Sequence, residues 1–74
     1  MNRPACYEIR VVEPLDSLWQ QWFPELEIIP AQAQPGPGTL LRGTLPDQAA
    51  LFGLLARVRD LNLTLLEVRR IEEA

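Results

Sequence analysis

Histidine and lysine are absent from the 74-residue sequence, and cysteine occurs once, at Cys6. Histidine is the side chain that most often performs general acid–base catalysis, and metal sites usually recruit histidines or several cysteines. A cysteine nucleophile also needs a base beside it. The sequence therefore predicts a protein that is not an enzyme and that carries no metal and no cofactor. The carboxylates that remain are expected to be solvated charges on strand faces and at strand ends.

Long hydrophobic runs are absent as well. No apolar stretch approaches the roughly 18 residues that a membrane span requires, and residues 1–5 contain one arginine but no apolar segment of the signal-peptide type. Cys6 has no second cysteine with which to form an internal disulfide, which fits a reducing compartment. We therefore expect a cytoplasmic protein that does not enter a membrane.

Positive charge is scarce. The net charge is −3 and the isoelectric point is near 4.7, whereas domains that bind nucleic acids usually present a basic face. An RNA-recognition domain would also need aromatic residues on the open face of its central strands, and Tyr7 falls on the predicted core side. Nucleic acid is therefore not expected as a partner.

The last third of the chain predicts one helix that runs directly into a strand. Asp47 is placed to cap the helix N-terminus, and Asn62 can end it in a left-handed backbone conformation. Apolar residues between them recur at three- and four-residue steps and so share one helix face: Leu51, Leu54, Leu55, Val58 and Leu61. From Thr64 the apolar period changes to two, which places Leu66 and Val68 on the core side of a strand.

Alternating and apolar segments predict three further strands, over residues 6–12, 26–30 and 39–45. After the first strand, apolar residues at helical spacing predict a short α-helix: Leu15, Leu18, Trp19, Trp22 and Phe23. The order strand, helix, strand, strand, helix, strand indicates an α+β, ferredoxin-like βαββαβ fold, a four-stranded antiparallel sheet with two helices on one face. Its first and third strands are expected to be central.

A single domain over residues 1–74 is small. Folding of so short a chain buries only about 60% of the surface that the unfolded chain exposes, which leaves a stability of a few kcal/mol. Self-association would add buried surface to such a domain. A homodimer is therefore a natural expectation.

Two glycine-containing segments have specific interpretations. Gly43 in the third strand is expected to leave room for a close neighbour, either a bulky side chain such as Trp19 or Trp22 or the helix that follows. The stretch of residues 31–38, AQAQPGPG, predicts a mobile turn between strands. It lacks the lysine and the following helix of a phosphate-binding loop.

The sheet face opposite the helices is predicted to combine charges of both signs with aliphatic side chains. Candidate contact residues on this face are Arg10, Leu40, Arg42 and Arg69. One interpretation is a solvated face on which glutamates such as Glu8 form weak ion pairs with the arginines. The alternative is a sheet-to-sheet dimer or a docking surface, because aliphatic residues can add an apolar patch there: Val12, Ile29, Leu40, Leu65 and Ile71.

The second predicted helix carries a strip of small residues, Ala49, Gly53 and Ala56, beside its apolar face. Glycine inside a helix costs roughly 0.5 to 1 kcal/mol relative to alanine, so a compensating contact is expected. Close packing against the first helix is one explanation, and a partner helix laid over the strip is the other. Phe52 lies next to the strip and is expected to be partly exposed, as an interface anchor would be.

The segment from Gly43 to Glu72 resembles the C-terminal part of a group of short uncharacterised bacterial proteins. The pattern that carries the resemblance consists of residues 47–51 (DQAAL), 53–55 (GLL), 59–61 (RDL) and 68–70 (VRR). Phe52 stands where such relatives would be expected to have histidine. The resemblance implies a small standalone domain and no known activity. The strand order also resembles that of ACT-type regulatory domains, which is a likeness at the level of the fold alone.

Three functional hypotheses follow. The first is a non-catalytic interaction or regulatory module that associates with itself or with a protein partner, through the open sheet or through the surface around Phe52. The second is an ACT-like sensor that binds a small metabolite. The third is a small dimeric enzyme that relies on carboxylate chemistry. The sequence leaves the partner and the ligand open.

Overall fold

The computed structural model describes residues 3–71 of the chain. Its elements are β1 (Ala5–Val11), η1 (Ser17–Trp22), β2 (Glu27–Ile29), η2 (Ala31–Ala33), β3 (Thr39–Leu45), α1 (Gln48–Asp60) and β4 (Leu65–Ile71), where η marks a 3-10 helix. The four strands and α1 begin and end close to the predicted positions. Glu72, the end of the segment that carries the resemblance, lies outside the described residues.

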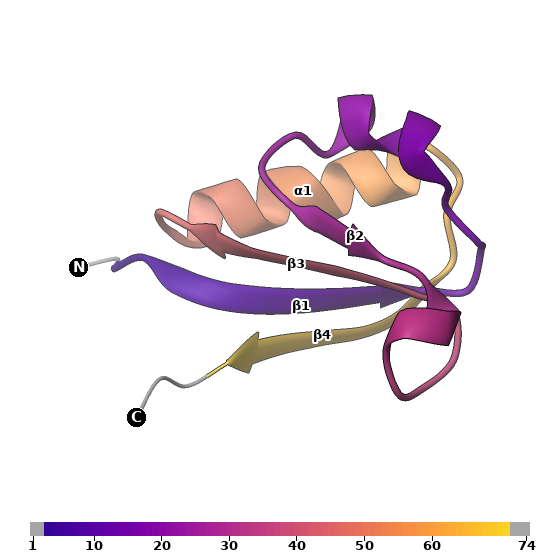
Figure 1. Cartoon of the computed structure of the whole chain (residues 1–74). Coiled ribbons are helices and arrows are strands. Elements are labelled where there is room, and N and C mark those ends of the chain that lie inside the picture. The colour runs from indigo at the N-terminus through magenta and orange to yellow at the C-terminus, as the bar shows by residue number, and fades with distance from the viewer. Residues whose placement is uncertain (1–2, 72–74) are drawn as a thin grey trace.

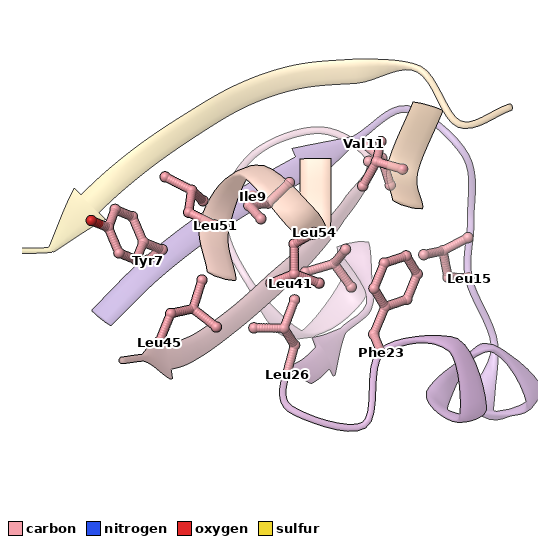
Figure 2. Close-up of a cluster of buried hydrophobic side chains, with 11 residues drawn as sticks. Tyr7, Ile9, Val11, Leu15, Phe23, Leu26, Leu41, Leu45, Leu51 and Leu54 are labelled. Carbon is pink, nitrogen blue, oxygen red and sulfur yellow. The ribbon is translucent and has the colours of Figure 1, made fainter. Parts of the chain in front are cut away.

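The strands form one antiparallel sheet in the order β2-β3-β1-β4. The prediction that the first and third strands are central is confirmed. Figures 1 and 2 show α1 lying across one face of the sheet, over β3 and β1, while β4 runs along an edge away from the helix. The fold is therefore α+β with an antiparallel four-stranded sheet.

The ends of α1 follow the predicted capping chemistry. The Asp47 carboxylate accepts a hydrogen bond of 2.8 Å from the Ala50 N–H, which satisfies one of the free amides of the first turn. Asn62 has a φ of 61°, the left-handed conformation that ends a helix. The Leu63 N–H then donates to the Val58 carbonyl. The chain leaves the helix at a defined angle and enters β4 two residues later.

The hydrophobic core lies between α1 and the two central strands. Alternate residues of a strand point to the same face, and those of β1 and β3 meet the apolar face of α1. The cluster consists of Tyr7, Ile9, Val11, Leu15, Phe23, Leu26, Leu41, Leu45, Leu51, Leu54 and Val58. Figure 2 shows most of these side chains, and no member of the cluster comes from the described residues of β4.

The first predicted helix is not an α-helix. Residues 17–22 form the 3-10 helix η1, none of whose side chains is buried, and Trp22 is largely exposed. Pro14 and Pro24 leave too few residues between them for a stable α-helix, and a 3-10 helix has three residues per turn, so the predicted apolar face does not form. Of the five predicted apolar residues, Leu15 and Phe23, on either side of η1, are buried in the core, Trp19 is partly buried against it, and Leu18 and Trp22 are exposed. The prediction of two α-helices on one face is therefore wrong.

Gly43 provides the close approach that the sequence predicts, but to a different neighbour. A Cβ atom at this position would lie 2.6 Å from Cδ2 of Leu26 and 2.7 Å from the carbonyl oxygen of Glu25. A bulky neighbour is therefore present as predicted, but it is Leu26 and not one of the suggested tryptophans or the following helix. The missing side chain lets the start of β2 cross the helix side of β3 and bury Leu26 in the core.

Gly43→Ala is expected to lower the free energy of unfolding by about 1–3 kcal/mol, because the added methyl group meets backbone and a packed leucine. Urea denaturation followed by circular dichroism measures the change. Thr44→Ala, at the exposed neighbouring position, is the matched control and should have a much smaller effect. Equal denaturation midpoints for Gly43→Ala and the unmodified chain would contradict the tight contact.

Candidate functional site

The sheet face opposite α1 is organised around the carboxylate of Glu8. The strand register places this residue of β1 between Arg42 on β3 and Arg69 on β4. Nη2 of Arg42 lies 2.7 Å from Oε2 of Glu8, and Nη2 of Arg69 lies 2.9 Å from Oε1. The hydrogen bonds from Arg69 and Arg42 hold the pKa of Glu8 below its usual range. The predicted ion pairs on this face are therefore confirmed for Arg42 and Arg69, whose side chains remain partly exposed.

Arg10 points into the turn that follows η2. Its guanidinium donates to Oε1 of Gln34 at 2.8 Å, to the Pro37 carbonyl at 2.9 Å and to the Pro35 carbonyl at 3.4 Å. The Arg10 side chain is only 13% exposed as a result. Leu40, its cross-strand neighbour, is 3% exposed and lies outside the cluster beneath α1. These two predicted contact residues are therefore covered by the chain itself, and Leu40 adds nothing to an exposed apolar patch.

Charges alternate in sign across the sheet and stop at the β4 edge. One register row runs from β2 to β4 through Glu27, Arg42, Glu8 and Arg69. The adjacent row ends at Glu67, whose carboxylate lies 3.6 Å from the Arg10 guanidinium. The outermost strand therefore presents one negative and one positive side chain, Glu67 and Arg69, on the same face. Both are more than half exposed along their side chains.

The helix side of β4 carries exposed apolar side chains together with one arginine, Arg70, which lies opposite the buried Tyr7. Leu65 and Leu66 are each 46% exposed and Val68 is 37% exposed, although Val68 lies directly opposite the buried Ile9. The predicted placement of Val68 on the core side is confirmed by this register, but the expected burial of Leu66 and Val68 is wrong. Leu65, predicted on the opposite face, pairs with the buried Val11 and so lies on the helix side as well. Since α1 packs over β3 and η1 lies against β2, no helix within residues 3–71 covers β4.

The small-residue strip of α1 faces solvent. A Cβ atom on Gly53 would have no atom within 4 Å, apart from its chain neighbours and the backbone of its own helix. Ala49 is exposed. Ala56 is half-buried, and Phe52 is 62% exposed. The exposure of Phe52 agrees with the prediction. The prediction that the first helix packs closely against Gly53 is wrong, because the 3-10 helix η1 does not reach this residue.

A groove of about 710 Å³ lies between the segment after β1 and the segment around η2. Its apolar lining includes Val12, Leu15 and Ile28. Two polar lining groups are already engaged within the chain, since Nε2 of Gln20 donates to two backbone carbonyls and the Thr39 hydroxyl donates to a third. Asp16 also lines the groove and accepts from the Leu18 N–H. The groove therefore offers apolar surface together with a few polar side chains, among them Ser17 and Gln32.

Two further kinds of site were sought in residues 3–71. No group of three or more histidine, cysteine, aspartate or glutamate side chains comes together as metal ligands would. None of the helices in this part of the chain has the length and the apolar character needed to cross a bilayer. The features that distinguish this surface are therefore the charged sheet face, the β4 edge, the exposed strip of α1 and the groove.

These features define a small α+β sheet domain with one covering helix and an exposed edge strand. Residues 6–69 match a domain of unknown function, DUF8691, and the chain belongs to this family. Comparison with curated proteins and with solved structures found no match. The predicted membership in an uncharacterised family is thus supported, whereas the C-terminal pattern and the likeness to ACT-type domains stay predictions.

The structure brings together only some of the predicted site residues. Arg42 and Arg69 meet at Glu8, whereas Arg10 and Leu40 are covered and the α1 strip stands apart on the helix. The exposed residues Leu66 and Val68 are not among the predicted site residues, because their spacing predicts that they are buried in the core. The signal that could have found them is the short segment between the prolines, which is too short for a second covering helix.

Lowering the pH is expected to reduce stability through Glu8. Because its pKa is lower in the folded chain, the unfolded chain binds the proton first as the pH falls below about 5. The stabilisation by Arg69 and Arg42 is therefore complete above that range and is lost as the pH falls through the folded-state pKa. Urea denaturation of Glu8→Gln should show lower stability at neutral pH and a weaker pH dependence. An unchanged pH dependence would contradict this role.

Gly53→Ala is expected to raise the free energy of unfolding by about 0.5–1 kcal/mol, because alanine favours the helix and the new methyl group meets nothing. Ala56→Gly, one turn away, is the matched control and should shift stability in the opposite direction. Thermal denaturation measures both. If Gly53→Ala instead destabilises the chain, something packs on the strip that the fold of one chain does not contain.

Proposed function

We propose that this chain is a non-catalytic protein-interaction module that binds a protein partner along the outer edge of β4. The observation that carries the proposal is that edge, on which Leu65, Leu66 and Val68 are all exposed. An uncovered strand edge readily pairs with an added strand, and adjacent apolar side chains extend the contact. The partly exposed charges of Glu67 and Arg69 would add selectivity on the other face.

The backbone of β4 is oriented for such pairing. The Val12 N–H donates to the Thr64 carbonyl at 2.9 Å, so this residue directs its amide toward the β4 side. The register break between Arg10 and Val11 skips Leu66 of β4 and no residue of β1. Backbone groups therefore alternate in direction along β1 without interruption, so Glu8 also directs its groups toward β4, where its partner is Arg69. The neighbouring Val68 then directs its N–H and C=O away from β1. A partner strand would meet these groups.

Photocrosslinking at the edge tests the proposal. A benzoylphenylalanine replacing Leu66 in the full chain, expressed in cells and irradiated, is expected to give a defined adduct. The same substitution at the exposed Gln21 of η1 is the control and should give none. Val68→Pro removes the outward amide while leaving the inner ladder of β4 intact, and it should abolish the adduct.

The outcomes separate edge pairing from other contacts. Loss of the Leu66 adduct in Val68→Pro supports strand addition, provided that circular dichroism shows that this variant is folded. An adduct that persists in folded Val68→Pro contradicts edge pairing. No adduct at Leu66 in the unmodified background would overturn the proposal.

A second candidate function, a small-metabolite sensor, is favoured by the groove beside Pro14. Its apolar lining suits a ligand with a hydrocarbon or aromatic part. The engaged state of Gln20 and Thr39 makes it less suited to a strongly polar ligand. A rise in melting temperature with added amino acids or nucleotides would support this function. An unchanged melting temperature with every amino acid and nucleotide tested would count against it.

A further inference from the structure

The charges on β4 are complementary to themselves. Glu67 and Arg69 flank Val68, which is the central residue of the seven-residue strand Leu65–Ile71. When two identical strands pair antiparallel about a two-fold axis, residues at equal distances from the axis face each other. An axis at Val68 therefore places Glu67 opposite Arg69 of the second copy, and Arg69 opposite its Glu67.

The two neighbouring two-fold registers are less favourable. An axis at Glu67 would place two carboxylates directly opposite each other, and an axis at Arg69 would do the same with two guanidinium groups. Like charges at facing positions destabilise a strand pair. The Val68 register pairs residues 66–70 of β4 in regular alternation, and only Leu65, beyond the register break at Leu66, and Ile71 fall outside it. It also places the outward backbone groups of Val68 against those of the second Val68.

We infer that the partner of β4 is a second copy of this chain, paired antiparallel through β4 about a two-fold axis at Val68. This inference rests on the proposed function, because it names the protein that occupies the same edge. The two sheets become one continuous eight-stranded sheet. On the helix side, the two copies of Val68 face each other across the axis and shield each other from water. Leu66 of each copy faces Arg70 of the other, and the aliphatic part of an arginine side chain packs on apolar surface.

The alternating charges on the opposite face support the second copy as the partner. The row that stops at the edge contains Glu27, Arg42, Glu8 and Arg69. In the dimer this row continues into Glu67 and Arg10 of the second copy, which already lie within 3.6 Å of each other in one chain. The signs of the charges alternate without interruption over six strands. The two-fold axis generates a second row of the same charges, which runs from Glu27 of the second copy to Arg10 of the first.

Charge exchange between two variants tests the register. Glu67→Arg and Arg69→Glu each convert both opposite-charge contacts into like-charge contacts. The dimer dissociation constant of each variant alone should therefore be at least about tenfold higher than that of the unmodified chain. In an equimolar mixture, the arginine introduced at position 67 faces the glutamate introduced at position 69 of the other chain. The mixture should form a heterodimer, measured by sedimentation velocity. A mixture as monomeric as its components would contradict the Val68 register.

Disulfide formation provides a measurement that does not depend on charge. In a Cys6→Ser background, Val68→Cys should give a crosslinked dimer under mild oxidation, because residues facing across the axis lie about 5.5 Å apart between Cα atoms. Leu66→Cys is the control and should not crosslink, since the two copies of this residue lie about 13 Å apart along the strands. Crosslinking of Leu66→Cys in preference to Val68→Cys would overturn the register.

The results also distinguish this inference from the proposed function. If the unmodified chain stays monomeric at high concentration and the Leu66 photoadduct contains a different protein, the second copy is excluded while the interaction module stands. A monomeric chain with no photoadduct would overturn both. A photoadduct of twice the mass of the chain, together with Val68→Cys crosslinking, supports both.

Discussion

One α-helix has to cover a four-stranded sheet, and the rest of the structure follows from this constraint. A helix is about 10 Å wide with its side chains, whereas neighbouring strands are about 4.8 Å apart, so α1 spans two strands and not four. It covers the central strands β1 and β3, and η1 with Phe23 fills the space near β2. The helix side of β4 stays exposed, although its residues Leu65, Leu66 and Val68 are as apolar as those of a core strand.

The other face of the sheet is stabilised by different chemistry. Glu8 is nearly buried beneath two guanidinium groups that come from the strands on either side, so one carboxylate links three strands. At the end of the sheet, Arg10 donates hydrogen bonds to Gln34, Pro35 and Pro37 and so fixes the proline- and glycine-rich turn against β1. The exposed part of this face is therefore smaller than the whole face of the four-stranded sheet, and it ends at the charged side chains of β4.

Sequence periodicity predicted the strands and α1 because it depends on which face of an element is apolar, and local capping at Asp47 and Asn62 marked the helix ends. It failed at Trp22, where helical spacing suggested burial. Two prolines bound that segment. The small number of residues between the prolines decides against an α-helix, although the segment itself is hydrophobic. The cross-strand pairing of Arg42 and Arg69 with Glu8 was predictable, since it requires only strand order and alternation.

The sequence by itself determined the secondary structure of most of the chain, its central strands and the sign of each charge on the open face. These properties depend on periods of two and of 3.6 residues and on neighbours close in sequence. Only the tertiary structure decided which apolar residues are covered. Whether Leu66, Val68 or Leu40 is buried depends on where α1 and the 31–38 segment lie, and that position is the result of packing between distant segments.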